Sequence, residues 1–228
     1  MRYIEILRIQ TQGLLENTVV IITSDHGEAF GDHGHFGHGP DLYLDEIGVP
    51  LVILSPGAPA GRVVESPVSL RDLPATVVDL LELSAGSPSP GSSLAAYWHW
   101  VPGKVPQGIT TPALSEKASA SAFQPQSGSG DGPIRFEMSL VASGHHYLRD
   151  AMGNEELYDL SRDPFELVNL VRSSPDNQAV GAFRKMLLDV LTENPASIEV
   201  DKVYLEAYKQ GLKALIPESS PRRVADGH

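Results

Sequence analysis

Residues 18–28 read TVVIITSDHGE, and the fold prediction for the chain starts from them. From Thr18 to Thr23 it is β-branched and apolar, which is typical of a strand buried on both faces of a parallel sheet. In open α/β sheets, ligands bind in the crevice outside the carboxyl ends of the strands, and here Asp25 and His26 come just after the strand. The stretch therefore predicts an α/β fold with a ligand site at the end of this strand.

The segment after this strand is rich in histidine and glycine. Four of the chain's eight histidines lie between His26 and His38, and Asp25 and Asp32 lie among them. Adjacent Asp and His side chains offer an oxygen and a nitrogen ligand, and further histidines can bind a metal or hydrogen-bond to an anion. The alternative is a solvated His-rich loop without function. The buried strand in front of the loop favours a ligand site.

The composition is that of an ordinary globular protein. The 228 residues are 41% apolar, enough for one sizeable domain or one domain with a small appendage. No stretch reaches the roughly 18 unbroken apolar residues of a membrane span, and the net charge of −12 argues against binding to nucleic acid. The chain has no cysteine and hence no disulfide framework. Residues 1–8 lack the zones of a signal peptide, which leaves the localisation open.

Periodicity predicts the remaining elements. Asp72, which precedes Pro74, is expected to cap a helix at 70–83. Alternation predicts a small antiparallel sheet, in which one of His145 and His146 points inward and the other outward in a packing role. The predicted helices lie at 4–13, 41–47, 70–83, 176–191 and 201–215, the predicted strands at 49–54, 113–119, 138–142, 145–149 and 156–160, and a disordered tail at 217–228.

Two groups of motifs carry a resemblance to a known family. The first comprises TSDHGE, FGDHGHFGHG, DEIGVPLVILSPG and SLRDLPATVVDLLEL, between Glu16 and Leu83. The second is ELYDL at 156–160, followed by Asp163-Pro164 and Asn169-Leu170. In this order, the motifs resemble those of the sulfatases of the alkaline phosphatase superfamily.

The resemblance implies roles for three residues. Asp25 and His26 stand where the family has a pair of ligands to a divalent cation, usually Ca²⁺, and the histidine leaves Mn²⁺ or Zn²⁺ open. His38 stands where family members carry a Lys or His that touches the oxygens of the ester, and would be the catalytic residue that stabilises charge developing there. The expected helpers, which orient these histidines or cap the loop, are Glu28, Asp32, His33 and His35.

The resemblance also implies an architecture. Residues 1–93 are expected to form part of an alkaline-phosphatase-like α/β sheet with helices, and residues 94–216 a small antiparallel α+β appendage. In the family, the nucleophile is a formylglycine made from a C/S-x-P-x-R motif upstream of this segment. The match at Ser219 to Arg223 lies in the polar tail and is interpreted as chance.

The expected function is metal-dependent hydrolysis of a small-molecule or carbohydrate sulfate ester. Because the nucleophile motif is absent from the predicted catalytic segment, we expect a C-terminal sulfatase portion that is inactive in isolation. Such an ester is an anion, so local positive charge from a metal and from histidine must overcome the acidic balance of the chain. A phosphodiester or phosphonate monoester hydrolase of the same superfamily and a non-catalytic metal-binding fragment remain as alternatives.

Overall fold

The computed structural model describes residues 11–38, 41–83, 91–99, 112–119, 135–150, 152–173, 178–193, 209–210 and 213. The predicted helix at 4–13 and the predicted segment at 201–215 fall almost wholly outside these residues, and so do the tail and its Ser219 to Arg223 motif. In chain order the elements are η1 (Leu14–Asn17), β1 (Val20–Thr23), β2 (Ala29–Phe30), η2 (Asp32–Gly34), β3 (Phe36–Gly37), α2 (Leu44–Ile47), β4 (Leu51–Leu54), η3 (Leu70–Asp72), α3 (Leu73–Leu80), η4 (Leu94–His99), β5 (Ala113–Ser119), β6 (Arg135–Ala142), β7 (His145–Asp150), β8 (Glu155–Asp159), α4 (Leu170–Ser173) and α5 (Gln178–Glu193).

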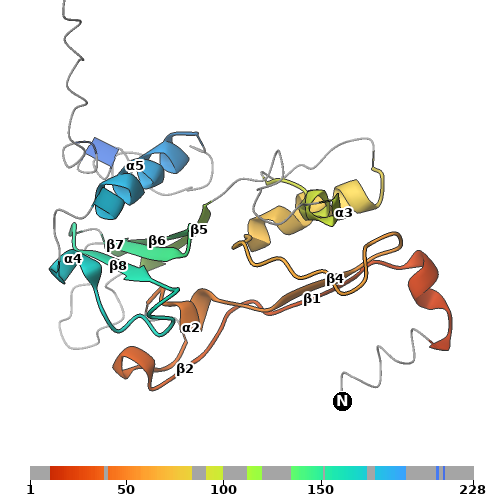
Figure 1. Ribbon diagram of the computed structural model, residues 1–228, viewed down its shortest axis with the longest axis horizontal. Coiled ribbons are helices and arrows are strands. Elements are labelled where there is room, and N and C mark those ends of the chain that lie inside the picture. The colour runs from red at the N-terminus through yellow and green to blue at the C-terminus, as the bar shows by residue number, and fades with distance from the viewer. Residues whose placement is uncertain are drawn as a thin grey trace, which may run out of the picture.

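The strand that precedes the His-rich loop differs from its prediction in two ways. β1 pairs with β4 in antiparallel register, Val20 opposite Leu54 and Thr23 opposite Leu51, and not in a parallel sheet. All four β1 residues are only half-buried, so burial on both faces is also wrong. An apolar β-branched run predicts a strand but carries no information about the direction of its partner. Figure 1 shows the pair extending away from the larger sheet, with α3 above it.

The larger sheet has four antiparallel strands in the order β5-β6-β7-β8. β5 has the predicted bounds, and the other three strands begin or end within three residues of theirs. α5 lies across one face of the sheet (Figure 1). Apolar residues recur at helical spacing along α5 and form a stripe on one side of the helix. This stripe packs on the inward-facing residues of the strands and so completes the core. The core cluster comprises Met138, Leu140, Ala142, Tyr147, Leu157, Val180, Phe183, Leu187 and Leu191.

The helix after β4 begins with a different cap from the one predicted. Ser69 caps the 3₁₀ turn η3, since its hydroxyl accepts a hydrogen bond from the Arg71 N–H at 3.2 Å. The Asp72 side chain makes no cap bond to α3. It is buried, and its Oδ1 accepts a bond from the Ser92 N–H at 2.9 Å. A buried carboxylate needs a donor, and here the segment before η4 supplies it.

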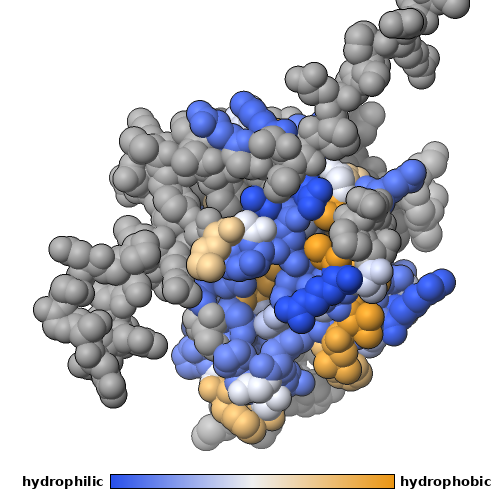
Figure 2. All heavy atoms as spheres, turned by 90° about the vertical axis from the view of Figure 1, so that its left-hand side faces the viewer, coloured by the Kyte–Doolittle hydropathy of each residue, from blue (hydrophilic) through white to orange (hydrophobic). Residues whose placement is uncertain are grey.

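A second apolar cluster joins the α2 region to the four-stranded sheet. Leu42 packs with Leu148 of β7 and Tyr158 of β8, and Tyr43 and Ile47 pack around them. The predicted helix at 41–47 is confirmed over its second half, as α2. Figure 2 shows the molecule from the left-hand side of Figure 1. The described residues on this face are largely hydrophilic, with separate apolar patches. Among the residues that the structure describes, no helix has the length and apolar character to span a bilayer.

Candidate functional site

Asp25 and His26 lie just beyond the end of β1, as predicted. Their side chains are exposed, at 88% and 44%, and Oδ2 of Asp25 lies 3.9 Å from Nε2 of His26. Nδ1 of His26 lies 2.7 Å from the Gly27 carbonyl oxygen, which fixes the proton on Nδ1 and leaves Nε2 as the free ring nitrogen. The same carbonyl raises the pKa of His26. Backbone hydrogen bonding and the neighbouring His26 lower the pKa of Asp25.

The β2–β3 hairpin returns the chain to His26. In its register Ala29 pairs with Gly37, so the flanking residues Glu28 and His38 come side by side. Oε2 of Glu28 lies 3.1 Å from Nδ1 of His38. The His38 ring stacks on His26 with 4.1 Å between centroids. The turn that allows this return has left-handed backbone at Gly31, His33 and Gly34, which explains the glycines of the segment.

The other two histidines of the loop lie elsewhere. His33 stacks on Tyr43 with 3.6 Å between ring centroids. Nε2 of His35 lies 3.6 Å from a carboxylate oxygen of Asp41. Asp32 accepts a hydrogen bond from the Phe30 N–H and so caps the turn. Of the four expected helpers, Glu28 orients a site histidine, Asp32 caps the loop, and His33 and His35 bind the loop to its surroundings.

The site residues fit a divalent cation. One ligand atom each from His26, Glu28 and His38 lie within 4.8 Å of one another. Ligand atoms that share one ion at 2.0–2.6 Å are roughly 3–5 Å apart, so this spacing and the 3.9 Å between Asp25 and His26 both suit a shared ion. Carboxylate oxygens suit Ca²⁺, whereas two imidazoles and a carboxylate suit a transition metal.

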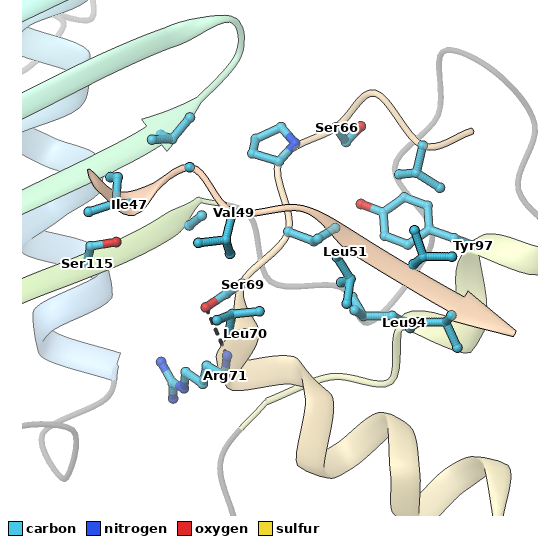
Figure 3. Close-up of a pocket in the computed structure, with 18 of the residues that line it drawn as sticks. Ile47, Val49, Leu51, Ser66, Ser69, Leu70, Arg71, Leu94, Tyr97 and Ser115 are labelled. Atoms are coloured by element: carbon cyan, nitrogen blue, oxygen red, sulfur yellow. Dashed lines mark hydrogen bonds between the residues drawn. The ribbon is translucent and has the colours of Figure 1, made fainter. Parts of the chain in front are cut away.

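An open groove of about 1400 Å³ begins at Asp25, His26 and His38 and runs along β4. Its far wall is apolar and includes Leu51, Leu94 and Tyr97, which cluster together (Figure 3). Close to this wall the Ser69 hydroxyl and Arg71 N–H form the bond that begins η3 (Figure 3). The half-buried β1–β4 pair therefore borders open space along this side.

The sequence of this chain matches those of known proteins. A sequence model named Sulfatase matches residues 6–83, which include Asp25, His26 and His38. An uncharacterized sulfatase of Escherichia coli, YidJ, is 32% identical over 209 residues, which are 91% of this chain and 37% of that protein. An arylsulfatase of Clostridium perfringens is 27% identical over 199 residues, or 82% of this chain and 36% of the relative. The chain belongs to the sulfatase family.

A solved structure agrees with this family. The phosphonate monoester hydrolase of Agrobacterium radiobacter superposes with a TM-score of 0.64 at 26% identity, over 81% of this chain and 37% of that one. The fold of the sulfatase chain is thus the alkaline-phosphatase-like α/β fold that its motifs predicted. Family membership indicates a divalent metal. The chain spans little more than a third of the length of the curated relatives it matches.

Two residues at or near this candidate site have contacts that the sequence did not predict. Glu28 was expected as a helper and does bond to His38, and it is in addition the acidic member of the three-residue cluster. The only signal was that Glu28 directly precedes β2. Because β2 and β3 are two residues long each, they are too short for sequence periodicity to reveal. Glu166, in the second motif group, was given no role, although it is buried at 3% exposure and bonds to the N-terminus of α2.

Proposed function

We propose that this chain carries the metal-binding part of a sulfatase active site, and that the complete protein hydrolyses sulfate esters with the help of a divalent cation. The observation that supports this most is the convergence of His26, Glu28 and His38 beyond the end of β1. The convergence falls within the segment that matches the sulfatase family. The relatives with matching sequence include two named sulfatases.

Asp25 and His26 are proposed to hold the cation. The Asp25 carboxylate is exposed and has a lowered pKa, so it is ionised and available over the whole neutral range. His26 offers Nε2, because Nδ1 is engaged by the Gly27 carbonyl. A bound cation would supply positive charge next to the ester oxygens. Ca²⁺ is the proposed ion on the strength of the carboxylate, with Mn²⁺ or Zn²⁺ as the alternative that the imidazoles favour.

His38 is the proposed catalytic residue. Glu28 accepts from its Nδ1–H and so directs Nε2 as the group that meets the ester. A protonated imidazole there would stabilise charge developing on the leaving oxygen, which typically contributes about 10² to 10⁴ in rate.

The proposed substrate is a small-molecule or carbohydrate sulfate ester. The chain has a net charge of −12 and would repel such an anion at long range. The cation, together with His38 in its protonated form, would supply the local positive charge that holds it. A phosphonate monoester is the second candidate, favoured by the likeness to the Agrobacterium hydrolase at 26% identity.

Metal titration of the purified chain tests the site. We expect Ca²⁺, Mn²⁺ or Zn²⁺ to bind once per chain, and Asp25→Ala or His26→Ala to weaken binding by at least about 10-fold. His145→Gln, which alters a histidine on the sheet, is the matched control and should leave the affinity unchanged. Binding that survives both Asp25→Ala and His26→Ala would contradict the assignment.

A substrate panel tests the chemistry. p-Nitrophenyl sulfate and p-nitrophenyl phenylphosphonate are compared under each metal, with Asp25→Ala as the inactive reference. Faster turnover of the sulfate supports the sulfatase assignment, and faster turnover of the phosphonate supports the second candidate. Metal binding with no turnover of either ester fits a metal-binding portion that needs the rest of the enzyme.

A further inference from the structure

Three buried polar side chains form a row that begins on two strands of the four-stranded sheet and ends in the loop after β8. Ser139 of β6, His146 of β7 and Glu166 have at most 3% of their surface exposed. The Ser139 hydroxyl lies 2.5 Å from Nε2 of His146. Nδ1 of the same ring bonds to Oε1 of Glu166. These are the residue types of a hydrolytic triad, but their burial denies them a substrate, so their role lies in what Glu166 holds.

Glu166, in the loop after β8, contacts the N-terminus of α2. Its Oε2 accepts a hydrogen bond from the Leu44 N–H at 2.8 Å, across 122 residues of sequence. The N-cap residue of α2, Tyr43, makes no side-chain cap bond. A carboxylate at this position satisfies a free N–H of the first turn and complements the helix dipole. Glu166 therefore supplies the cap that α2 lacks locally.

α2 in turn holds the backbone of the candidate site. The Gly27 N–H donates to the Glu46 carbonyl oxygen at 2.6 Å, and the Glu28 N–H donates to the Asp45 carbonyl oxygen at 2.9 Å. These two donors follow His26 directly and include the residue that orients His38. The chain of bonds from Ser139 to Glu28 is therefore continuous through His146, Glu166 and α2.

The backbone of Glu166 supports a specific role. Its φ is 57°, a left-handed conformation that a glutamate rarely adopts. Such a conformation persists only when the surroundings determine it, and here they include the bond from its N–H to the Asp163 carbonyl oxygen and the two bonds of its carboxylate. We infer that Glu166, oriented by His146 and Ser139, is a positioning residue for the metal-binding loop. The inference concerns the loop backbone, and only its metal readout rests on the proposed function.

Amide hydrogen exchange, resolved by residue, tests the inference without metal or substrate. In Glu166→Ala we expect the amides of Leu44, Gly27 and Glu28 to exchange about 10- to 100-fold faster, the factor that a lost bond to a charged group allows. Glu166→Gln keeps an oxygen that can accept from Leu44, so the acceleration should fall below about 10-fold. Where Glu166→Ala folds too poorly to measure, two milder variants, Glu166→Gln and Ser139→Ala, replace it. In both, exchange of these three amides must accelerate relative to wild type by a larger factor than exchange of the β6 amides.

Glu155→Gln is the matched control. Glu155 is also a buried carboxylate of this sheet, and it bonds to Arg149 and Arg184. It should lower overall stability while accelerating the amides of Gly27 and Glu28 no more than those of β6. The inference is overturned if Glu155→Gln and Glu166→Gln affect these amides equally at equal stability, or if Glu166→Ala leaves them at the wild-type rate.

A second readout connects the loop to the metal. Mn²⁺ affinity, followed by water-proton relaxation, should fall about 10-fold in Glu166→Ala and recover in Glu166→Gln. Affinity that is unchanged in a variant with accelerated Gly27 and Glu28 exchange would overturn the link from the loop to the metal. If wild type binds no Mn²⁺, Ca²⁺ or Zn²⁺, the proposed function fails, while the exchange experiment still decides whether Glu166 positions the loop.

Discussion

Glu28 and His38 meet across the β2–β3 hairpin, with Oε2 of the carboxylate 3.1 Å from Nδ1 of the imidazole. They are ten positions apart in sequence, and the pairing of Ala29 with Gly37 brings them together. The His38 ring also stacks on His26. The hairpin thereby converts a linear run of histidines into a cluster with one acid and two imidazoles.

Removal of the Glu28 carboxylate should weaken metal binding. Because its carboxylate lies beside His26 and adds negative charge next to the cation that Asp25 and His26 are proposed to hold, Glu28→Ala should lower Mn²⁺ or Zn²⁺ affinity by about 10- to 100-fold in calorimetric titration. Asp32→Asn is the control, since Asp32 is an acid of the same loop that accepts from the Phe30 N–H. It should change the affinity less than twofold. Equal affinities for Glu28→Ala and wild type would show that Glu28 only shapes the loop.

Gly27 is required by the closeness of α2. A Cβ at this position would lie 2.0 Å from the Asp45 carbonyl oxygen, so Gly27→Ala must push the loop and α2 apart. We expect a loss of about 1–3 kcal/mol in the free energy of unfolding, measured in urea. The control is Gly181→Ala in α5, where nothing lies within 4 Å of the added methyl group. There alanine should stabilise by up to about 1 kcal/mol, and a stable Gly27→Ala would contradict the crowding.

The sequence predicts what depends on local periodicity. The strand at 113–119 and the helix that carries Val180, Phe183 and Leu187 are found where predicted, because alternation and helical spacing identify them within one element. Asp25 and His26 are likewise found at the end of a strand, since a residue that follows an apolar run must lie there. The motifs add the family, because short residue combinations in a fixed order are more specific than periodicity.

What the sequence does not predict depends on contacts between distant residues. The antiparallel direction of β1 and β4 is set by how 27 intervening residues return the chain, and no residue within either strand encodes it. The bond between Glu166 and Leu44 spans 122 positions. Asp72 illustrates the same limit, because a residue typical of helix caps is used instead to bond to Ser92.

Glu155 should make the free energy of unfolding depend on pH in the acidic range. Burial alone would raise its pKa, but hydrogen bonds from Arg184 and Tyr147 and the charges of Arg184 and Arg149 outweigh it, so the pKa lies below the ordinary 4.5. Its contribution is therefore fully present above about pH 4.5 and is lost as the pH falls through the lower folded value. Glu155→Gln should cost about 3 kcal/mol at pH 7 in urea. The difference from wild type should shrink below pH 4.5, and a constant difference would contradict the sign.

Asp45 should change the stability in the opposite direction as the pH rises. Burial and the nearby charge of Asp41 raise its pKa above the ordinary 3.8, and its Oδ1 is buried with no hydrogen-bond partner among the described residues. The charged form is therefore less favourable in the folded state, and stability is lost as the pH rises through the raised pKa. Asp45→Asn keeps the backbone carbonyl that accepts from Glu28 and removes the charge. We expect it to stabilise the chain by about 1 kcal/mol at pH 7 in urea, with the gain disappearing below pH 3.8. A variant less stable than wild type at pH 7 would show that the Asp45 carboxylate serves the loop in its charged form.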